Sequence, residues 1–303
     1  MTGPINTNMG ALFALQNLTR TTRELDQSQT RISTGLRIGA AADNGAVFNV
    51  AEQLRADNSA TEALRAGLNR ALSAADVAMA AGTKLSDILV QMREKALSAT
   101  ALNLTPASRQ AYNDEFIALR DEITQLVDSA AFDRNNLLNG GGSSTIPNLG
   151  TKFDVLANIG GTAMIPIPIT DFRLLDTITP PPPLPVPPAL PMPYGANQMH
   201  LEATSNVATP EAAGDMMGRI SASLEFISGQ LANIGISAKR VEGHLSFIAA
   251  LRDSNTTGLG ALVDTDYGLE TARLQAAQIK QQLTTQSLSI ANTAPQAILA
   301  LLR

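Results

Sequence analysis

The stretch from residue 217 to residue 248 reads MGRISASLEFISGQLANIGISAKRVEGHLSFI and decides the fold of the chain. Uncharged residues recur in it at alternating spacings of three and four, at ten successive positions: Met217, Ile220, Leu224, Ile227, Leu231, Ile234, Ala238, Val241, Leu245 and Ile248. This spacing is the heptad seam of a coiled-coil helix. A helix of about 45 residues here would be about 68 Å long, too long for burial in a compact domain. The stretch therefore predicts an elongated, mainly α-helical protein.

The composition excludes several classes of protein. Of the 303 residues 44% are hydrophobic but only 4% aromatic, so the apolar residues are mostly helix-forming Ala and Leu with Ile and Val. The absence of Cys excludes disulfide frameworks, Cys-ligated zinc and thiol nucleophiles. A net charge of −5 without a basic face argues against nucleic acid as a partner. No apolar run approaches the roughly 20 residues of a membrane helix, and residues 1–8 lack the features of a cleavable secretory signal.

Proline divides the chain into a first arm, an insert and a second arm. Eleven of the 16 prolines lie between Pro166 and Pro193, whereas residues 1–139 and 210–303 contain four. The insert has short period-two stretches, such as Ile165, Ile167 and Ile169, which predict small β-strands or hairpins. Within it, residues 180–188 predict an exposed polyproline II spacer, an interpretation that we favour over a P-x-x-P ligand.

The two arms mirror each other. The first begins with a weak seam that ends at Gly35, has a hinge at 36–43 where Asp43 or Asn44 can cap a new helix, and continues in a long Ala-rich seam. Thr105 and Pro106 start a third helix as N-cap and first residue. In the second arm, residues 255–260 break the long helix before a final seam. The inner helices can pair within one chain, but the outer two should order fully only when other copies bury their remaining apolar face.

Residues that carry chemistry are scarce. His244 lies on a helix flank and is interpreted as a solvated rim histidine, while His200 falls in the insert. The spacing that a helical di-iron site requires is absent, and the glycine groups at 140–142 and 258–260 match neither the P-loop nor the dinucleotide fingerprint. We therefore expect no catalytic, cofactor-binding or metal site and no enzyme activity, and we assign the methionines on the seams to the core.

The terminal motifs resemble those of bacterial flagellin. Residues 31–43 read RISTGLRIGAAAD, similar to the N-terminal signature R-L-S-S-G-L-R-I-N-S-A-A-D-D of that family. Ile5 to Asn8, followed by Ala11-Leu12, are part of the same resemblance. Residues 291–302 read ANTAPQAILALL and resemble the C-terminal pattern, together with Gln278-Ile279. The hinge residues that match the family motif are Arg31, Gly35, Leu36, Arg37 and Asp43.

The resemblance implies an inner core formed by residues 1–35 and 262–303, linkers at 36–43 and 255–261, a helical shell formed by 44–139 and 210–254, and a β and proline-rich surface insert at 140–209. We expect self-assembly through the seam of the terminal helices: Leu15, Leu18, Leu25, Ile32, Leu269, Ala276, Ile279, Leu283, Ile290, Leu299 and Leu302. The shell seam comprises Leu64, Leu68, Leu85, Leu89, Met217, Ile220, Leu224, Ile227, Leu231, Ile234, Val241, Leu245 and Ile248.

The function that the resemblance implies is that of a structural subunit that builds a helical filament for motility outside the bacterial cell. It further implies uncleaved export through the flagellar type III apparatus, and contacts of the terminal helices with an export chaperone, a filament cap and hook-associated proteins. A hook–filament junction protein and a secreted coiled-coil binding module are the alternatives, and the intact C-terminal pattern favours the filament subunit.

Overall fold

The computed structural model describes residues 8–140, 152–175 and 199–301, with side chains described as far as Thr293. The predicted proline segment at 180–188 lies outside these residues. The described elements are α1 (Met9–Thr34), α2 (Gly45–Ala99), α3 (Pro106–Ser129), β1 (Ala131–Phe132), β2 (Asn135–Asn136), β3 (Lys152–Leu156), β4 (Met164–Pro168), α4 (Pro210–Val263) and α5 (Tyr267–Leu301). The mainly α-helical fold class is confirmed, and the two small sheets are both antiparallel.

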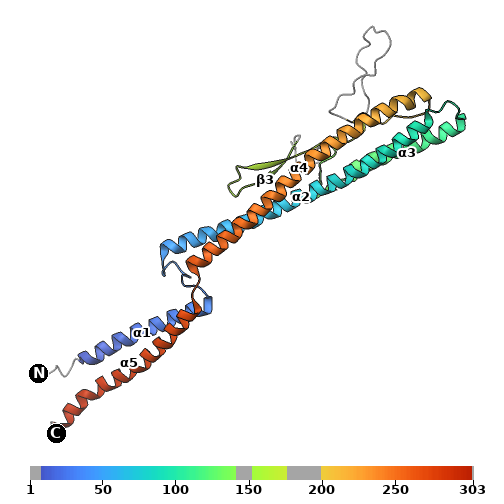
Figure 1. Cartoon of the computed structure of the whole chain (residues 1–303). Helices are drawn as coiled ribbons and strands as arrows, with labels where there is room; N and C mark the ends of the chain where they lie inside the picture. The colour runs from blue at the N-terminus through green and yellow to red at the C-terminus, as the bar shows by residue number, and fades with distance from the viewer. Residues whose placement is uncertain (1–7, 141–151, 176–198, 302–303) are drawn as a thin grey trace. The chain divides into compact units, whose positions relative to one another are not determined.

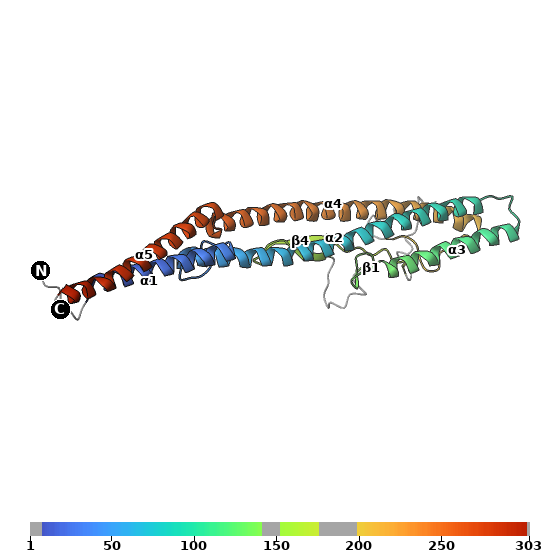
Figure 2. The ribbon, with the colours of Figure 1, turned by 90° about the horizontal axis from the view of Figure 1, so that it is seen from below.

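The chain divides into two units. One, here called the terminal unit, comprises Met1–Ser59 and Leu251–Arg303, and the other, the bundle unit, comprises Ala60–Ala250. In the terminal unit, α1 and α5 lie side by side in both ribbon views (Figures 1 and 2). They run antiparallel, since Asn8 Nδ2 donates to the carbonyl of Ala291 at 2.7 Å and Ser28 Oγ donates to Glu270 Oε1 at 2.8 Å.

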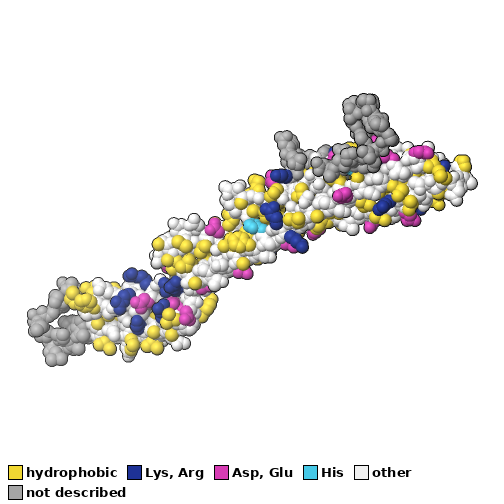
Figure 3. Space-filling view, turned by 45° about the horizontal axis from the view of Figure 1, so that its top comes forward, with side chains coloured by type: hydrophobic (Ala, Val, Ile, Leu, Met, Phe, Trp, Pro, Cys, Tyr) yellow, Lys and Arg dark blue, Asp and Glu magenta, His cyan; other side chains and the backbone are white. Residues whose placement is uncertain are grey.

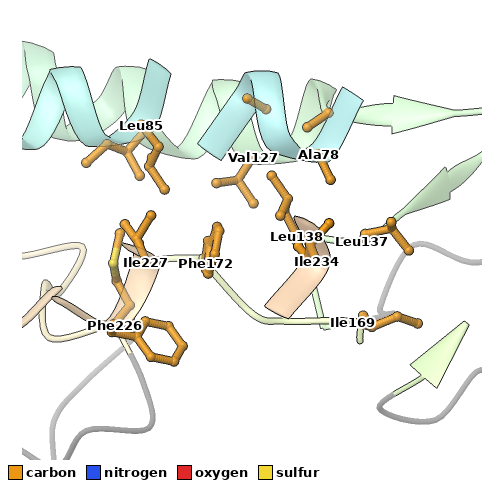
Figure 4. Packing of buried hydrophobic residues seen from close by; sticks show 14 of the residues in the cluster. Ala78, Leu85, Val127, Leu137, Leu138, Ile169, Phe172, Phe226, Ile227 and Ile234 are labelled. Atoms are coloured by element: carbon orange, nitrogen blue, oxygen red, sulfur yellow. The ribbon is translucent and has the colours of Figure 1, made fainter. Parts of the chain in front are cut away.

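The bundle unit has one continuous core between α2, α3 and α4. Small residues on α2, among them Ala71, Ala75 and Ala78, are almost fully buried and let α4 approach closely. A Cβ atom added to Gly82 would collide with the Leu231 side chain, so α4 lies directly against this glycine. Figure 4 shows side chains from all three helices pointing toward one another in this core.

The described part of the insert belongs to the same core. Strands β3 and β4 form the predicted hairpin, with Val155 opposite Ile165 and both buried. Phe172 is fully buried, and the centroid of its ring lies 5.8 Å from that of Phe226 of α4 in an edge-on arrangement. His244 is half-buried, and its Nε2 lies within hydrogen-bonding distance of the Ala157 carbonyl. The prediction of a solvated His244 is therefore wrong, because the hairpin packs over this part of α4.

The predicted break at 255–260 is also wrong. Helix α4 continues to Val263. Each glycine destabilises a helix by only about 1 kcal/mol, and Thr256 Oγ1 donates a hydrogen bond within the helix to the Arg252 carbonyl at 2.8 Å. The chain turns instead at 264–266, where Asp266 Oδ1 accepts from the backbone N–H groups of Gly268 and Leu269 and caps α5.

Other predicted boundaries are confirmed. Gly35 ends α1 with φ 73°, and Asn44 caps α2, its Oδ1 accepting from the backbone N–H of Val47 at 3.2 Å. Thr105 is the N-cap of α3, with Pro106 in its first turn. Helix α3 ends at Ser129, and a tight hairpin of β1 and β2 follows. Asp133 and Arg134 both have positive φ in that hairpin, as its two-residue turn requires.

Candidate functional site

The terminal unit carries an apolar surface that the chain itself leaves uncovered. Four large apolar residues of α5 are each more than half exposed: Leu269 at 52%, Ile279 at 59%, Leu283 at 58% and Ile290 at 64%. Leu269, Leu283 and Ile290 fall on one heptad series and Ile279 lies one turn before Leu283, so the four residues form a stripe along one face of the helix. The N-terminal end of α1 adds the exposed side chains of Met9, Leu12, Phe13 and Leu15. Exposed apolar surface of this extent indicates an interaction site.

The polar side chains of the terminal unit gather elsewhere. Figure 3 shows Lys, Arg, Asp and Glu side chains over the middle of this unit and hydrophobic side chains at its edges. Among the charged residues of the terminal unit, Arg31 of α1 and Arg273 of α5 both face the carboxylate of Glu270. On the face that Figure 3 shows, charged and hydrophobic side chains of this unit thus occupy different regions.

The predicted seam residues divide between two faces of the α1–α5 pair. On α1, Leu25 is buried and Leu18 and Ile32 are half-buried against α5, whereas Leu15 is exposed. On α5, the predicted residues Leu269, Ala276, Ile279, Leu283 and Ile290 are all exposed. The residues of α5 that face α1 lie one position further along the chain: Glu270, Leu274, Ala277, Gln281 and Thr284. The side chain of Leu299 and the whole of Leu302 are outside the described residues.

The sequence analysis did not select Met9, Leu12 and Phe13. They fall off the heptad series through Leu15, and they are exposed beside it on α1. A search for a second apolar stripe on the same helix could have found them.

The predicted hinge is tied to the end of α4. The Arg37 backbone N–H donates to the Val263 carbonyl at 2.7 Å, and its Nη2 donates to the Leu262 carbonyl at 2.8 Å. Leu36 forms an antiparallel bridge with Asp264. These bonds satisfy carbonyl groups that the end of a helix leaves without partners. The motif residues therefore join the C-terminal end of α1 to the turn between α4 and α5.

Substitution of Gly35 by Ala tests this junction. Gly35 has φ 73°, and a Cβ there would lie 2.9 Å from the Tyr267 hydroxyl. A left-handed conformation costs a residue with a Cβ about 1–2 kcal/mol, so we expect the free energy of opening of the α1–α5 pair, measured by amide hydrogen exchange, to fall by that amount. Gly45→Ala is the control, since an added Cβ there meets nothing within 4 Å. Equal exchange in the two variants would contradict the proposed strain.

The predicted shell seam lies in the bundle core. Nine of its thirteen residues are buried, and Met217, Leu224, Leu231 and Leu245 pack against the same cluster. The side chains of this seam are therefore covered by other parts of the same chain. It differs in this respect from the stripe on α5, which has no covering in the described structure.

The described residues contain no cluster of three or more His, Asp and Glu that could hold a metal ion. None of their helices is long and apolar enough to cross a membrane. A hollow of about 440 Å³ beside the β3–β4 hairpin is lined mainly by apolar residues of α2 and β3. Nothing in this hollow combines a nucleophile with a general base.

Comparison with known proteins identifies the family. Residues 5–143 match the model of the bacterial flagellin N-terminal helical region, and residues 217–302 match that of the C-terminal helical region. The chain belongs to the bacterial flagellin family. Flagellin FljM of Caulobacter vibrioides is 40% identical over 299 residues, covering 99% of this chain and 98% of that protein. A flagellin of Brucella melitensis is 29% identical, covering 99% of both chains.

A solved structure is also similar. The crystal structure of Bacillus cereus flagellin is 16% identical, covers 60% of this chain and 88% of its own, and has a TM-score of 0.45. This likeness is too distant to carry part of the assignment, which stands on the sequence matches. This flagellin is a structural subunit of the extracellular bacterial flagellar filament, and it polymerises with other flagellin subunits.

Proposed function

We propose that this flagellin assembles through the apolar surface of its terminal helices, with α1 and α5 of every subunit forming the inner core of the filament. The exposure of Ile279, Leu283 and Ile290 is the observation that carries the proposal. Burial of a large aliphatic side chain is worth about 1.5–3 kcal/mol. A stripe of this kind is costly in water and stabilising once a neighbouring copy covers it.

The arrangement of the rest of the chain follows the same proposal. Residues 1–35 and 262–303 would form the inner core, residues 44–139 and 210–254 the surrounding shell, and the insert at 140–209 the outer surface. The shell seam is already buried within one chain, which supports a self-contained shell around a core completed by neighbours. The role is structural and involves no catalysis or cofactor.

The family-implied partners are proposed to use the same surface. In this proposal, an export chaperone binds the subunit before assembly, and the filament cap and the hook-associated proteins bind it at the ends of the filament. A chaperone that covered the stripe on α5 would prevent premature polymerisation, because the stripe is the surface that subunits need for one another.

The triple variant Ile279→Ser, Leu283→Ser, Ile290→Ser tests the proposal. All three side chains are exposed, so the helical content and melting temperature of the subunit should match the parent. The loss of about 5 kcal/mol of burial per subunit would raise the critical concentration for assembly more than a thousandfold. Sedimentation and electron microscopy should find no filaments at concentrations where the parent polymerises.

The matched control is Leu102→Ser, which removes an 88% exposed apolar side chain from the loop after α2. It should polymerise like the parent. A triple variant that forms filaments at the parent's critical concentration would refute the proposed interface.

A further inference from the structure

The contact between α1 and α5 has few fully buried apolar side chains. Among its described residues, Thr21, Leu25, Ser28, Glu270 and Ala277 are buried, and only Leu25 and Ala277 are apolar. Leu18, Ile32 and Leu274 add half-buried apolar surface. Because these residues recur with the heptad, a shift of one heptad changes apolar burial little. The hydrogen bonds that join residues 35–37 to residues 263–265 hold one end of the pair, and polar contacts between the helices add to the axial alignment.

A buried carboxylate lies at one end of this contact, in the first turn of α5. Glu270 is 2% exposed, and its Oε1 accepts a hydrogen bond from Ser28 Oγ at 2.8 Å. Arg273 Nη1 donates to its Oε2 at 3.2 Å, and Arg31 Nη1 lies 3.8 Å from Oε1. Ser28 and Arg31 belong to α1, so two of the three partners hold the carboxylate across the contact. A carboxylate is buried at acceptable cost only when such partners are in place.

A shift of one heptad would remove both partners from α1. In one direction, Glu270 would face Thr21 and Glu24, so that a second carboxylate would replace the guanidinium of Arg31. In the other direction, it would pass Gly35, where α1 ends. The observed alignment is the one that gives Glu270 a hydroxyl and a cation.

A second polar contact lies near the other end of α1. Asn8 accepts from the Ala11 backbone N–H through Oδ1 at 3.0 Å and donates through Nδ2 to the Ala291 carbonyl at 2.7 Å. The same side chain therefore caps α1 and fixes its start to one position on α5. Polar bonds hold the pair at both ends, and the apolar contact lies between them.

We propose that Ser28, Arg31 and Glu270 form a register lock: positioning residues that fix the alignment of α1 along α5. The correct alignment brings the apolar end of α1 to the level of the stripe on α5, so that neighbouring subunits meet one continuous surface. This inference rests on the proposed assembly interface and deepens it. The lock selects the alignment, and the apolar stripe supplies the free energy of assembly.

The absence of cysteine from the chain allows a direct test by cross-linking. A Cβ added to Gly10 would lie 3.8 Å from the Cβ of Ala291, within the range of about 3.5–4.5 Å that a disulfide requires. The pair Gly10→Cys, Ala291→Cys therefore reports the observed alignment. The pair Gly10→Cys, Thr284→Cys reports a shift of one heptad. Both pairs are made in the full chain and oxidised before and after assembly.

Glu270→Leu is the decisive variant, because leucine adds apolar burial while removing the lock. We expect its helical content to equal or exceed that of the parent. The cross-link to position 284 should rise about fivefold or more above the parent's background, because the observed register loses its ion pair and the shifted register no longer places Glu270 beside Glu24. Filament yield should fall about tenfold. Ser28→Thr keeps the hydroxyl and should retain the parent's cross-link and filaments.

The outcomes separate the lock from the interface. If Glu270→Leu cross-links only to position 291, or slips and still assembles like the parent, the register lock is overturned while the apolar interface stands. If the variant with three serines on α5 assembles normally, the interface itself is refuted whatever the cross-links report. If Glu270→Leu shows the cross-link of the shifted alignment and fails to assemble, while Ser28→Thr keeps the parent's cross-link and filaments, the register lock and the apolar interface are both supported.

Discussion

Deletion of the chain from Leu269 onward should abolish filament formation and leave a folded, monomeric protein. The deletion removes nearly all of α5, hence both the apolar stripe and the partner that α1 needs. The core of the bundle unit is built from residues between Ala60 and Ala250 and contains no residue of α5. Its melting temperature should therefore remain within about 2 °C of the parent, a shift that corresponds to less than about 1 kcal/mol.

The measurement combines thermal unfolding by circular dichroism with electron microscopy of concentrated protein. The full chain is the control for polymerisation, and the melting transition is the control for folding. Polymers formed by the deletion variant would place the assembly interface outside α5. Loss of the melting transition would instead contradict the independence of the bundle core.

Phe172→Ala should give the largest loss of stability among single substitutions in the insert. Phe172 is fully buried, and Figure 4 shows it among side chains that include Leu138 and Ile227. Removing a buried phenylalanine ring costs about 3–5 kcal/mol, and its edge-on contact with Phe226 is lost as well. For a unit of this size, the melting temperature should fall by about 6–20 °C.

The matched control is Ile159→Ala, near the β3–β4 hairpin, where the side chain is 45% exposed. It should change the free energy of unfolding by about 0.5 kcal/mol or less. Equal melting temperatures for the two variants would mean that the insert does not contribute to the bundle core.

Heptad spacing predicts the helices well because it is a local property of the sequence. The seam from Met217 to Ile248 predicts the centre of α4, and Thr105 with Pro106 predicts the start of α3. The break at 255–260 is wrong since two glycines in an otherwise helical stretch cost less than the continued helix gains. Asp266, which caps α5, was the stronger local signal.

Which face of α5 packs against α1 is harder to predict from the sequence. Helix α5 has two apolar or small-residue series one position apart, through Leu283 and through Thr284. Periodicity selects the series through Leu283, because it has more aliphatic residues, but periodicity does not tell which series meets α1 and which one is left exposed. The exposed series is the one with more large aliphatic side chains. The structure resolves this choice, because the buried Glu270 fixes the inward face.

Contacts between distant segments were missed for a similar reason. The alternation of Ile165 and Ile167 predicts a strand, and β4 confirms it. Nothing in that local pattern indicates that the strand packs into a core with α2 and α4, or that His244 reaches the Ala157 carbonyl. Such contacts depend on loop closure between residues far apart in the chain, which local patterns do not encode.

The most direct test of the assembly surface is a reconstruction of the filament at side-chain resolution. In the single chain, Ile279, Leu283 and Ile290 are each 58% exposed or more. We predict that all three are buried against α1 or α5 of neighbouring subunits in the filament, with Glu270 still bonded to Ser28. Filaments in which these three side chains face a water-filled channel or bulk solvent would contradict the account.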